Sequence, residues 1–168
     1  MNVVFSITNR ILSRADPWLA ERGDYERLFV AGDSAGANTA HNLTMKRGVR
    51  IEGMILAHPY FWGATPIDGE IKNPLVRLML DWAWRVVSSD EISSSLDHPS
   101  INPVAEGAPD LAGLGCERAM VFLAELDPWH FRGRAYYEAL TESGKEAAVL
   151  QSTCFILRIR RRSWLPRL

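Results

Sequence analysis

The feature that most constrains the fold of this chain is a serine flanked by two glycines, in the run Gly32-Asp33-Ser34-Ala35-Gly36. The apolar segment 27–31 before it is typical of a fully buried parallel strand, and residues 39–47 after it are typical of a helix. Glycines at the two outer positions allow a very tight turn, because a Cβ at either one would clash across it. The run therefore predicts a strained strand-to-helix turn that projects the Ser34 hydroxyl above the end of a sheet.

Strands and helices alternate along the rest of the chain. Short apolar segments at 51–57, 119–124 and 147–151 are typical of further strands, and helical patterns occur at about 17–22, 74–88 and 132–143. Between the second and third strands lies an insertion, residues 59–117, which is irregular apart from its helix. This order predicts an α/β protein with a partial, mostly parallel sheet flanked by helices.

The composition is that of a globular protein, and its charge excludes some partners. The 168 residues are enough for one domain, with 47% hydrophobic and 23% charged residues. A net charge of −1 argues against nucleic acid or an acidic membrane as a partner. The charge is uneven, since residues 1–153 carry −6 and residues 154–168 carry five arginines and no acid. We interpret this basic tail as a solvated segment rather than a nucleic-acid or nuclear-targeting patch.

Neither a membrane span nor a metal site is indicated. No run approaches the roughly 18 apolar residues that a spanning helix needs. The two cysteines, Cys116 and Cys154, are too few for a disulfide framework and match no metal-ligand spacing. We therefore expect no cofactor, and a reduced compartment, with the cytosol as the default location.

Several other short motifs accompany the serine turn. They are Asp16-Pro17-Trp18-Leu19, Ala40-His41-Asn42, His58-Pro59-Tyr60-Phe61, Asn102-Pro103, Gly113-Leu114-Gly115-Cys116-Glu117-Arg118, Glu125-Leu126-Asp127 and Arg132-Gly133-Arg134-Ala135-Tyr136-Tyr137. Together they resemble the plant carboxylesterase family, in the hormone-sensitive-lipase-like branch (fold-3) of the α/β-hydrolases. The resemblance covers residues 14–153. Residues 1–13 form an unmatched N-terminal segment, and residues 154–168 form a divergent tail.

The resemblance implies hydrolysis of a small-molecule carboxylic ester by a serine nucleophile. Ser34 would be that nucleophile, within an elbow completed by Gly32, Asp33 and Gly36. The Ala35 backbone N–H, at the start of the helix, would point at the developing oxyanion. The catalytic acid would be Asp127, which follows the third strand. An alternative for Asp127 is the N-cap of the next helix, since Pro128 follows it directly.

Two parts of the family's machinery are not found in this sequence. The family's catalytic histidine follows the last strand, but the last histidine here is His130, which shares a loop with Asp127. We expect His41 to pack, His58 to bond locally and His98 to be exposed. The family's oxyanion run, His-Gly-Gly-Gly, does not occur either. The chain thus resembles a family member truncated at both ends, and we expect it to be inactive alone, because a serine without a general base is a poor nucleophile.

Two other functions stay open. One is non-catalytic binding of a small molecule, since the gibberellin receptors resemble the same family and also lack the triad histidine. The other is a truncated product without independent function, whose elbow strand would expose an unpaired edge that favours association. Tyr60, Trp62, Trp82 and Trp84 either line an apolar pocket or pack within the insertion.

Overall fold

The computed structural model describes residues 13–46, 48–88, 92 and 94–153. Residues 1–12 of the N-terminal segment and the whole arginine-rich tail, 154–168, lie outside the described residues. The elements in chain order are α2 (Pro17–Arg22), β1 (Phe29–Asp33), α3 (Ala35–Thr44), β2 (Gly53–Ala57), α4 (Pro74–Val87), the short 3-10 helix η1 (Leu111–Gly113), β3 (Arg118–Ala124), α6 (His130–Glu142) and β4 (Glu146–Ser152). The predicted alternation of strands and helices is confirmed.

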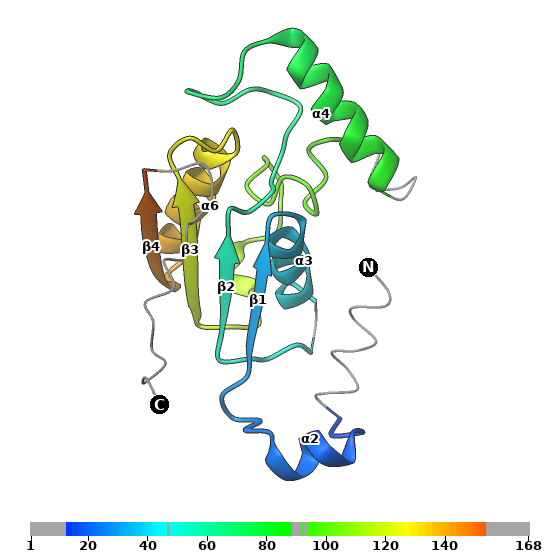
Figure 1. Ribbon diagram of the computed structural model, residues 1–168, viewed down its shortest axis with the longest axis vertical. Helices are drawn as coiled ribbons and strands as arrows, with labels where there is room; N and C mark the ends of the chain where they lie inside the picture. The colour runs from blue at the N-terminus through cyan, green and yellow to red at the C-terminus, as the bar shows by residue number, and fades with distance from the viewer. Residues whose placement is uncertain (1–12, 47, 89–91, 93, 154–168) are drawn as a thin grey trace, which may run out of the picture.

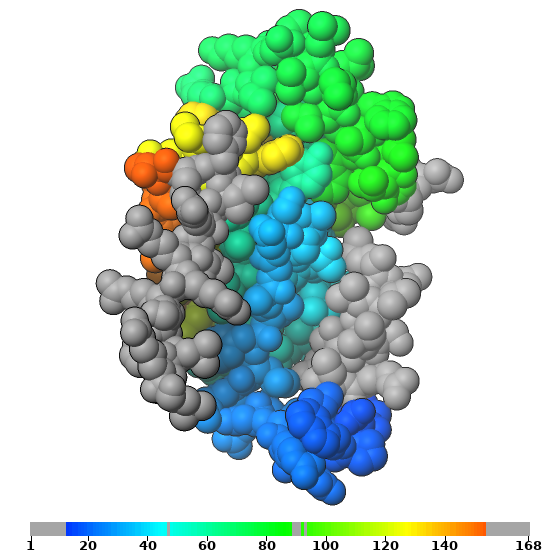
Figure 2. Space-filling view, viewed as in Figure 1, coloured from blue at the N-terminus to red at the C-terminus, as the bar shows by residue number. Residues whose placement is uncertain are grey.

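The four strands form one parallel sheet in the order β1-β2-β3-β4. All four arrows in Figure 1 point the same way, so the carboxyl ends of the strands share one edge. The part of the insertion that contains α4 lies at that edge (Figures 1 and 2). In open α/β sheets this edge is where ligands bind.

Helices α3 and α6 pack on the same face of the sheet and form the main core with it. The buried core residues are Ala37, Ala40, Met54, Leu56, Phe61, Leu111, Leu114, Cys116, Ala119, Val121, Leu123, Tyr136 and Leu140. A buried hydrogen bond of 2.7 Å between His41 Nδ1 and the Tyr136 hydroxyl joins the two helices. The apolar side chains of β2 and β3 that alternate toward this face supply its strand side.

Strand β1 differs from the fully buried strand that was predicted. Its side chains alternate between exposed and half-buried, and Phe29 is 55% exposed. β1 is the edge strand of the described sheet, and the face that carries Phe29 also leaves Met120 and Leu150 exposed. The prediction was wrong because burial depends on how many sides of a strand are covered, and β1 is packed on one face. The unpaired edge itself was predicted correctly for the described residues.

The insertion has a small core of its own, built from Trp62, Trp84, Leu96 and Ile101. A buried ion cluster fixes it to α6. Arg132 donates from Nε to Glu70 Oε1 at 2.7 Å and from Nη2 to Glu70 Oε2 at 3.1 Å. Arg77 of α4 donates to the same carboxylate at 3.2 Å. Because Arg132 lies five residues after Asp127, this cluster links the insertion to the loop after β3.

Helix α4 begins at Pro74 behind an Asn73 cap, which accepts the Leu75 and Val76 N–H groups. Its inner side buries Trp84, whereas its outer side exposes large apolar residues, namely Leu75, Leu78, Met79, Trp82 and Val86. Within the described residues, no helix has both the length and the apolar character to cross a bilayer.

Candidate active site

Ser34 lies at the turn between β1 and α3 with backbone angles φ 53° and ψ −116°. A positive φ is uncommon for a residue with a Cβ and costs on the order of 1–3 kcal/mol, so the turn is strained as predicted. Two of its hydrogen bonds join it to the end of β2 and the segment that follows. The Ser34 N–H donates to Ala57 O at 2.9 Å, and the Tyr60 N–H donates to Ser34 O at 3.2 Å. The serine is exposed, and its side chain does not cap the helix.

The two glycines of the elbow have different roles. A Cβ on Gly32 would collide with the carbonyl group of Gly36 and lie 2.6 Å from the Ala37 nitrogen. A Cβ on Gly36 would meet nothing within 4 Å. The prediction that both positions exclude a side chain is therefore wrong for Gly36. Helix α3 also starts earlier than predicted, at Ala35 instead of residue 39, so the second glycine is already in the helix.

Asp127 follows β3 at the same sheet edge and is 8% exposed. Its Oδ1 accepts the Trp129 N–H at 3.0 Å, which forms an Asx-type turn. Helix α6 begins at His130, and its N-cap residue is Trp129, with no side-chain capping bond. The alternative in which Asp127 is the N-cap is therefore not what the structure shows.

Burial raises the pKa of the Asp127 carboxyl above its ordinary value. The Trp129 N–H, His58 and His130 oppose this and lower the pKa, whereas the nearby Asp33 carboxylate raises it further. These charges come from the ends of three neighbouring strands. The sheet edge thus gathers titratable groups around Asp127, and such a concentration is common at active sites.

His58 lies directly after β2, the strand between β1 and β3 in the sheet. Its backbone has φ 44°, a second strained position at the sheet edge, and its N–H donates to Phe122 O at 2.9 Å. The side chain is 8% exposed, and Nδ1 lies 3.4 Å from Asp33 Oδ1. The partner of the His58 ring is therefore not local in the sequence, as was predicted, but is Asp33, the last residue of the neighbouring strand β1.

The other histidines are placed differently. His41 is a packed residue of α3, as predicted, and burial lowers its pKa to about 3. His98 is half-buried, and its Nδ1 accepts the Ser100 N–H at 3.1 Å, so the prediction that it is exposed is wrong. His130 is 9% exposed, and its Nδ1 has no hydrogen-bond partner in the part of the chain that the structure describes.

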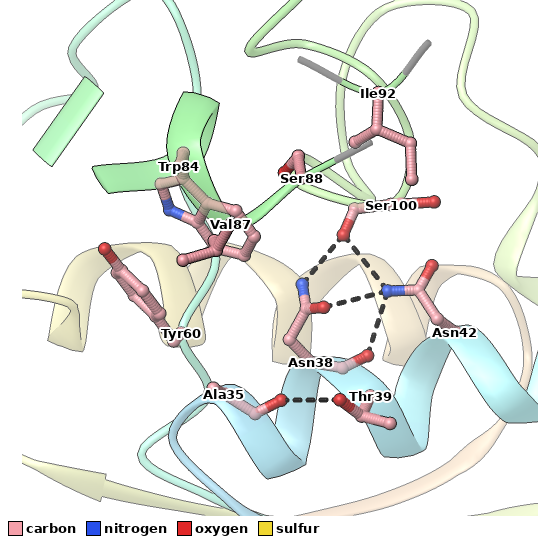
Figure 3. Close-up of a pocket in the computed structure, with 10 residues that line it drawn as sticks. All are labelled: Ala35, Asn38, Thr39, Asn42, Tyr60, Trp84, Val87, Ser88, Ile92 and Ser100. Carbon is pink, nitrogen blue, oxygen red and sulfur yellow. Dashed lines mark hydrogen bonds between the residues drawn. The ribbon is translucent and has the colours of Figure 1, made fainter. Parts of the chain in front are cut away.

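A cavity of about 400 Å³ opens beside the start of α3, under α4 (Figure 3). Its lining residues are Ala35, Asn38, Thr39, Asn42, Tyr60, Trp84, Val87, Ser88, Ile92 and Ser100. Of the four aromatic residues proposed for a pocket, Tyr60 and Trp84 line it, Trp62 is fully buried and Trp82 is 66% exposed.

Apart from Ala35, the α3 residues that line this cavity were not among the predicted site residues. Asn38 and Asn42 both donate their side-chain amides to Ser100 O, at 2.8 and 3.0 Å, and so tie α3 to the insertion. The four-residue spacing of Asn38 and Asn42 places them on one helix face and was a usable signal. Among the described residues, no group of three or more His, Cys, Asp or Glu side chains is arranged to hold a metal ion.

Comparison with known proteins agrees with the observed fold. The sequence profile of the α/β hydrolase fold family matches residues 2–153. Tuliposide A-converting enzyme 1 of Tulipa gesneriana is 49% identical over 131 residues, which are 77% of this chain and 33% of that protein. Probable carboxylesterase 2 of Arabidopsis thaliana is 45% identical over 133 residues, 76% of this chain and 42% of that protein. The chain thus spans a third to two fifths of the length of these relatives.

A solved α/β-hydrolase from the metagenome of Lake Arreo superimposes with a TM-score of 0.69 at 22% identity. The match covers 88% of this chain and 46% of that one, and at this identity it bears on the fold alone.

Proposed function

The chain belongs to the α/β-hydrolase fold family, and on that basis we propose that its function is carboxylic ester hydrolysis with Ser34 as the nucleophile. The observation that carries the proposal is the positive φ of Ser34 at the head of α3, at the sheet edge where Asp127 also lies. This is the strained strand-to-helix turn on which α/β-hydrolases present their nucleophile.

In the proposed reaction the Ser34 hydroxyl attacks the ester carbonyl and forms a tetrahedral intermediate. The Ala35 N–H, at the N-terminus of α3, stabilises the oxyanion. A general base takes the hydroxyl proton and gives it to the alcohol oxygen as the ester C–O bond breaks, and water then releases the acyl group from Ser34 as the carboxylic acid. The Asp127 carboxylate orients that base and stabilises its charged form. The Trp129 N–H holds one Asp127 oxygen, which fixes the carboxylate for this role.

The names of the two relatives support a small-molecule ester as the substrate, since one is called a carboxylesterase and the other a tuliposide A-converting enzyme. We further propose that this 168-residue chain alone hydrolyses esters very slowly. The last histidine of the chain is His130, and no histidine follows β4. The His41 ring is hydrogen-bonded to the Tyr136 hydroxyl in the core. General-base catalysis is worth roughly 10²–10⁴-fold in rate, so a chain without a positioned base loses most of its activity.

Chemical rescue tests both proposals. Hydrolysis of p-nitrophenyl butyrate is followed with and without added imidazole, which can act as a free base. Without imidazole, we expect the purified chain to hydrolyse the ester at the same rate as Ser34→Ala. As the imidazole concentration rises, the rate of the native chain should exceed that of the variant. Asp127→Asn should reduce this extra rate, whereas Asp68→Asn, an exposed aspartate of the insertion, should not.

Equal imidazole-dependent rates for the native chain and Ser34→Ala would rule out Ser34 as the nucleophile. A high Ser34-dependent rate without imidazole would instead contradict the proposed low activity of the chain.

We propose the cytosol as the compartment, on the strength of the low cysteine content. The tuliposide relative is named as chloroplastic. Imaging of the tagged protein in plant cells distinguishes the two locations.

A further inference from the structure

We propose that the cavity between α3 and α4 binds an aromatic ring of the ester substrate. Tyr60 forms the wall that contacts this ring, next to the nucleophile elbow. This inference rests on the proposed function and specifies its substrate class. It depends on three features, namely the position of the cavity, the character of its wall and its size.

The position of the cavity relates it to the reacting groups. Ala35, whose N–H is the proposed oxyanion donor, is part of the lining. Tyr60 is also part of the lining, and its backbone N–H is bonded to Ser34 O at 3.2 Å. A carbonyl group held at the Ala35 N–H therefore has the cavity beside it, and one of its two substituents can enter.

One wall of the cavity is aromatic and preorganised. The Tyr60 ring stacks on Trp84 with centroids 4.7 Å apart and an interplanar angle of 32°. The Tyr60 ring also meets Trp129 edge-to-face, with ring centroids 4.8 Å apart. Trp129 belongs to the loop of Asp127 and Trp84 to α4, so Tyr60 is held between that loop and α4. A flat ring gains from stacking on such a wall beyond its simple burial, by roughly 0.5–1.5 kcal/mol for an aromatic pair.

Trp84 is held by this stacking and by packing. The residue is 7% exposed, and its indole N–H has no hydrogen-bond partner among the described residues. Burial also raises the pKa of the Tyr60 phenol, so the wall is uncharged at neutral pH. An uncharged wall suits a neutral ring better than a charged group.

The opposite side of the cavity is polar but already satisfied. The Asn38 and Asn42 amides are committed to Ser100 O, and the Thr39 hydroxyl donates to Ala35 O at 2.9 Å (Figure 3). These contacts fix the shape of that side and leave few free donors for a strongly polar ligand. The volume of about 400 Å³ lies within the range of small-molecule sites and accommodates a bicyclic ring.

Binding is tested without turnover, by NMR on the ¹⁵N-labelled chain. The probes are 2-naphthol and 2-naphthoate, the alcohol and acid halves of two naphthyl esters, with 1-octanol as an aliphatic control. The reporters are the Ala35 amide and the Trp84 indole N–H, whose signal is assigned by its loss in Trp84→Phe. We expect at least one naphthyl probe to shift both reporters saturably, and 1-octanol to bind at least about fivefold more weakly.

Two variants of α4 locate the site. Val87 lines the cavity and is 74% exposed, so Val87→Trp narrows the cavity at little cost to folding. Val86 is 59% exposed and is not among the lining residues, which makes Val86→Trp a matched control. We expect Val87→Trp to weaken naphthyl binding on the order of tenfold, equivalent to about 1.4 kcal/mol, and Val86→Trp by less than about twofold.

Binding of 2-naphthol supports a ring on the alcohol side of the ester, and binding of 2-naphthoate supports a ring on the acyl side. The proposal is overturned if neither probe shifts the reporters, if 1-octanol binds as tightly, or if the two variants weaken binding equally. Failure of the proposed function would appear in the Ser34-dependent rate and would leave these binding results unchanged.

Discussion

Replacing Glu70 by glutamine removes the carboxylate that joins the insertion to α6. The Glu70 side chain is fully buried, and the Arg132 side chain is 2% exposed. Their contact is bidentate, at 2.7 and 3.1 Å, and Arg77 binds the same carboxylate at 3.2 Å with its side chain 12% exposed. Glutamine keeps the size of the side chain and removes its charge.

The expected loss of stability follows from burial. Removing one partner of a buried ion pair costs roughly 3–5 kcal/mol, because the other charge stays buried without compensation. Glu70→Gln keeps an amide oxygen that can accept one of the bonds, so we expect a loss near the lower end, about 3 kcal/mol. For a chain of 150–250 residues each kcal/mol lowers Tm by roughly 2–4 °C, which gives a decrease of about 6–12 °C.

Circular dichroism during urea and thermal unfolding measures both values. The matched control is Glu146→Gln, which also removes a carboxylate bound to an arginine, Arg118, at 3.2 Å. This pair is exposed, with the two side chains 77% and 58% accessible, and exposed pairs contribute roughly 0–1 kcal/mol. Equal losses for the two variants, or a loss below about 1 kcal/mol for Glu70→Gln, would refute the argument that this buried cluster holds the insertion in place.

Two further predictions concern the elbow and the core. Gly32→Ala should prevent correct folding of the elbow, because the new Cβ would meet the Gly36 carbonyl, whereas Gly36→Ala should retain the native Tm within a few degrees. A comparable decrease of Tm in both variants, measured by circular dichroism, would contradict the assigned roles of the two glycines. Below pH 6.5 the unfolded chain binds a proton at His41, whereas the folded chain does not take it up until about pH 3. The free energy of unfolding should therefore decrease as the pH is lowered through this window, by up to about 1.4 kcal/mol per pH unit. The raised pKa of Asp127 acts in the opposite direction and partly offsets this decrease. His41→Gln should make the dependence of Tm on pH between 4 and 6.5 shallower, and an unchanged slope would exclude His41 as its source.

The sequence was sufficient to predict the elements that local patterns define. Strand and helix positions followed from short apolar segments and capping residues, such as Asp16, which accepts the Leu19 N–H at 3.0 Å. The strained turn at Ser34 was predictable because Gly32, which makes it sterically possible, is close in sequence to the Gly36 backbone that it contacts.

Features that depend on distant residues were not predictable in this way. The burial of β1 depends on what covers its second face and its edge, which the strand's own residues do not encode. The cavity combines α3 with Tyr60, Trp84 and Ser100, and the ion cluster joins Glu70 to Arg132, 62 positions apart. No periodicity connects such positions, so these contacts become visible only in the folded chain.

The lengths of the connections between the strands have a consequence for how this fold can vary. Nineteen residues separate β1 from β2, 21 separate β3 from β4, and 60 separate β2 from β3. Because the entropy of closing a loop grows only with the logarithm of its length, a connection three times longer costs about 1 kcal/mol more. Evolution can therefore lengthen, shorten or rewrite the segment above the sheet at small thermodynamic expense, and can change which molecules are admitted while the strands beneath it stay in register.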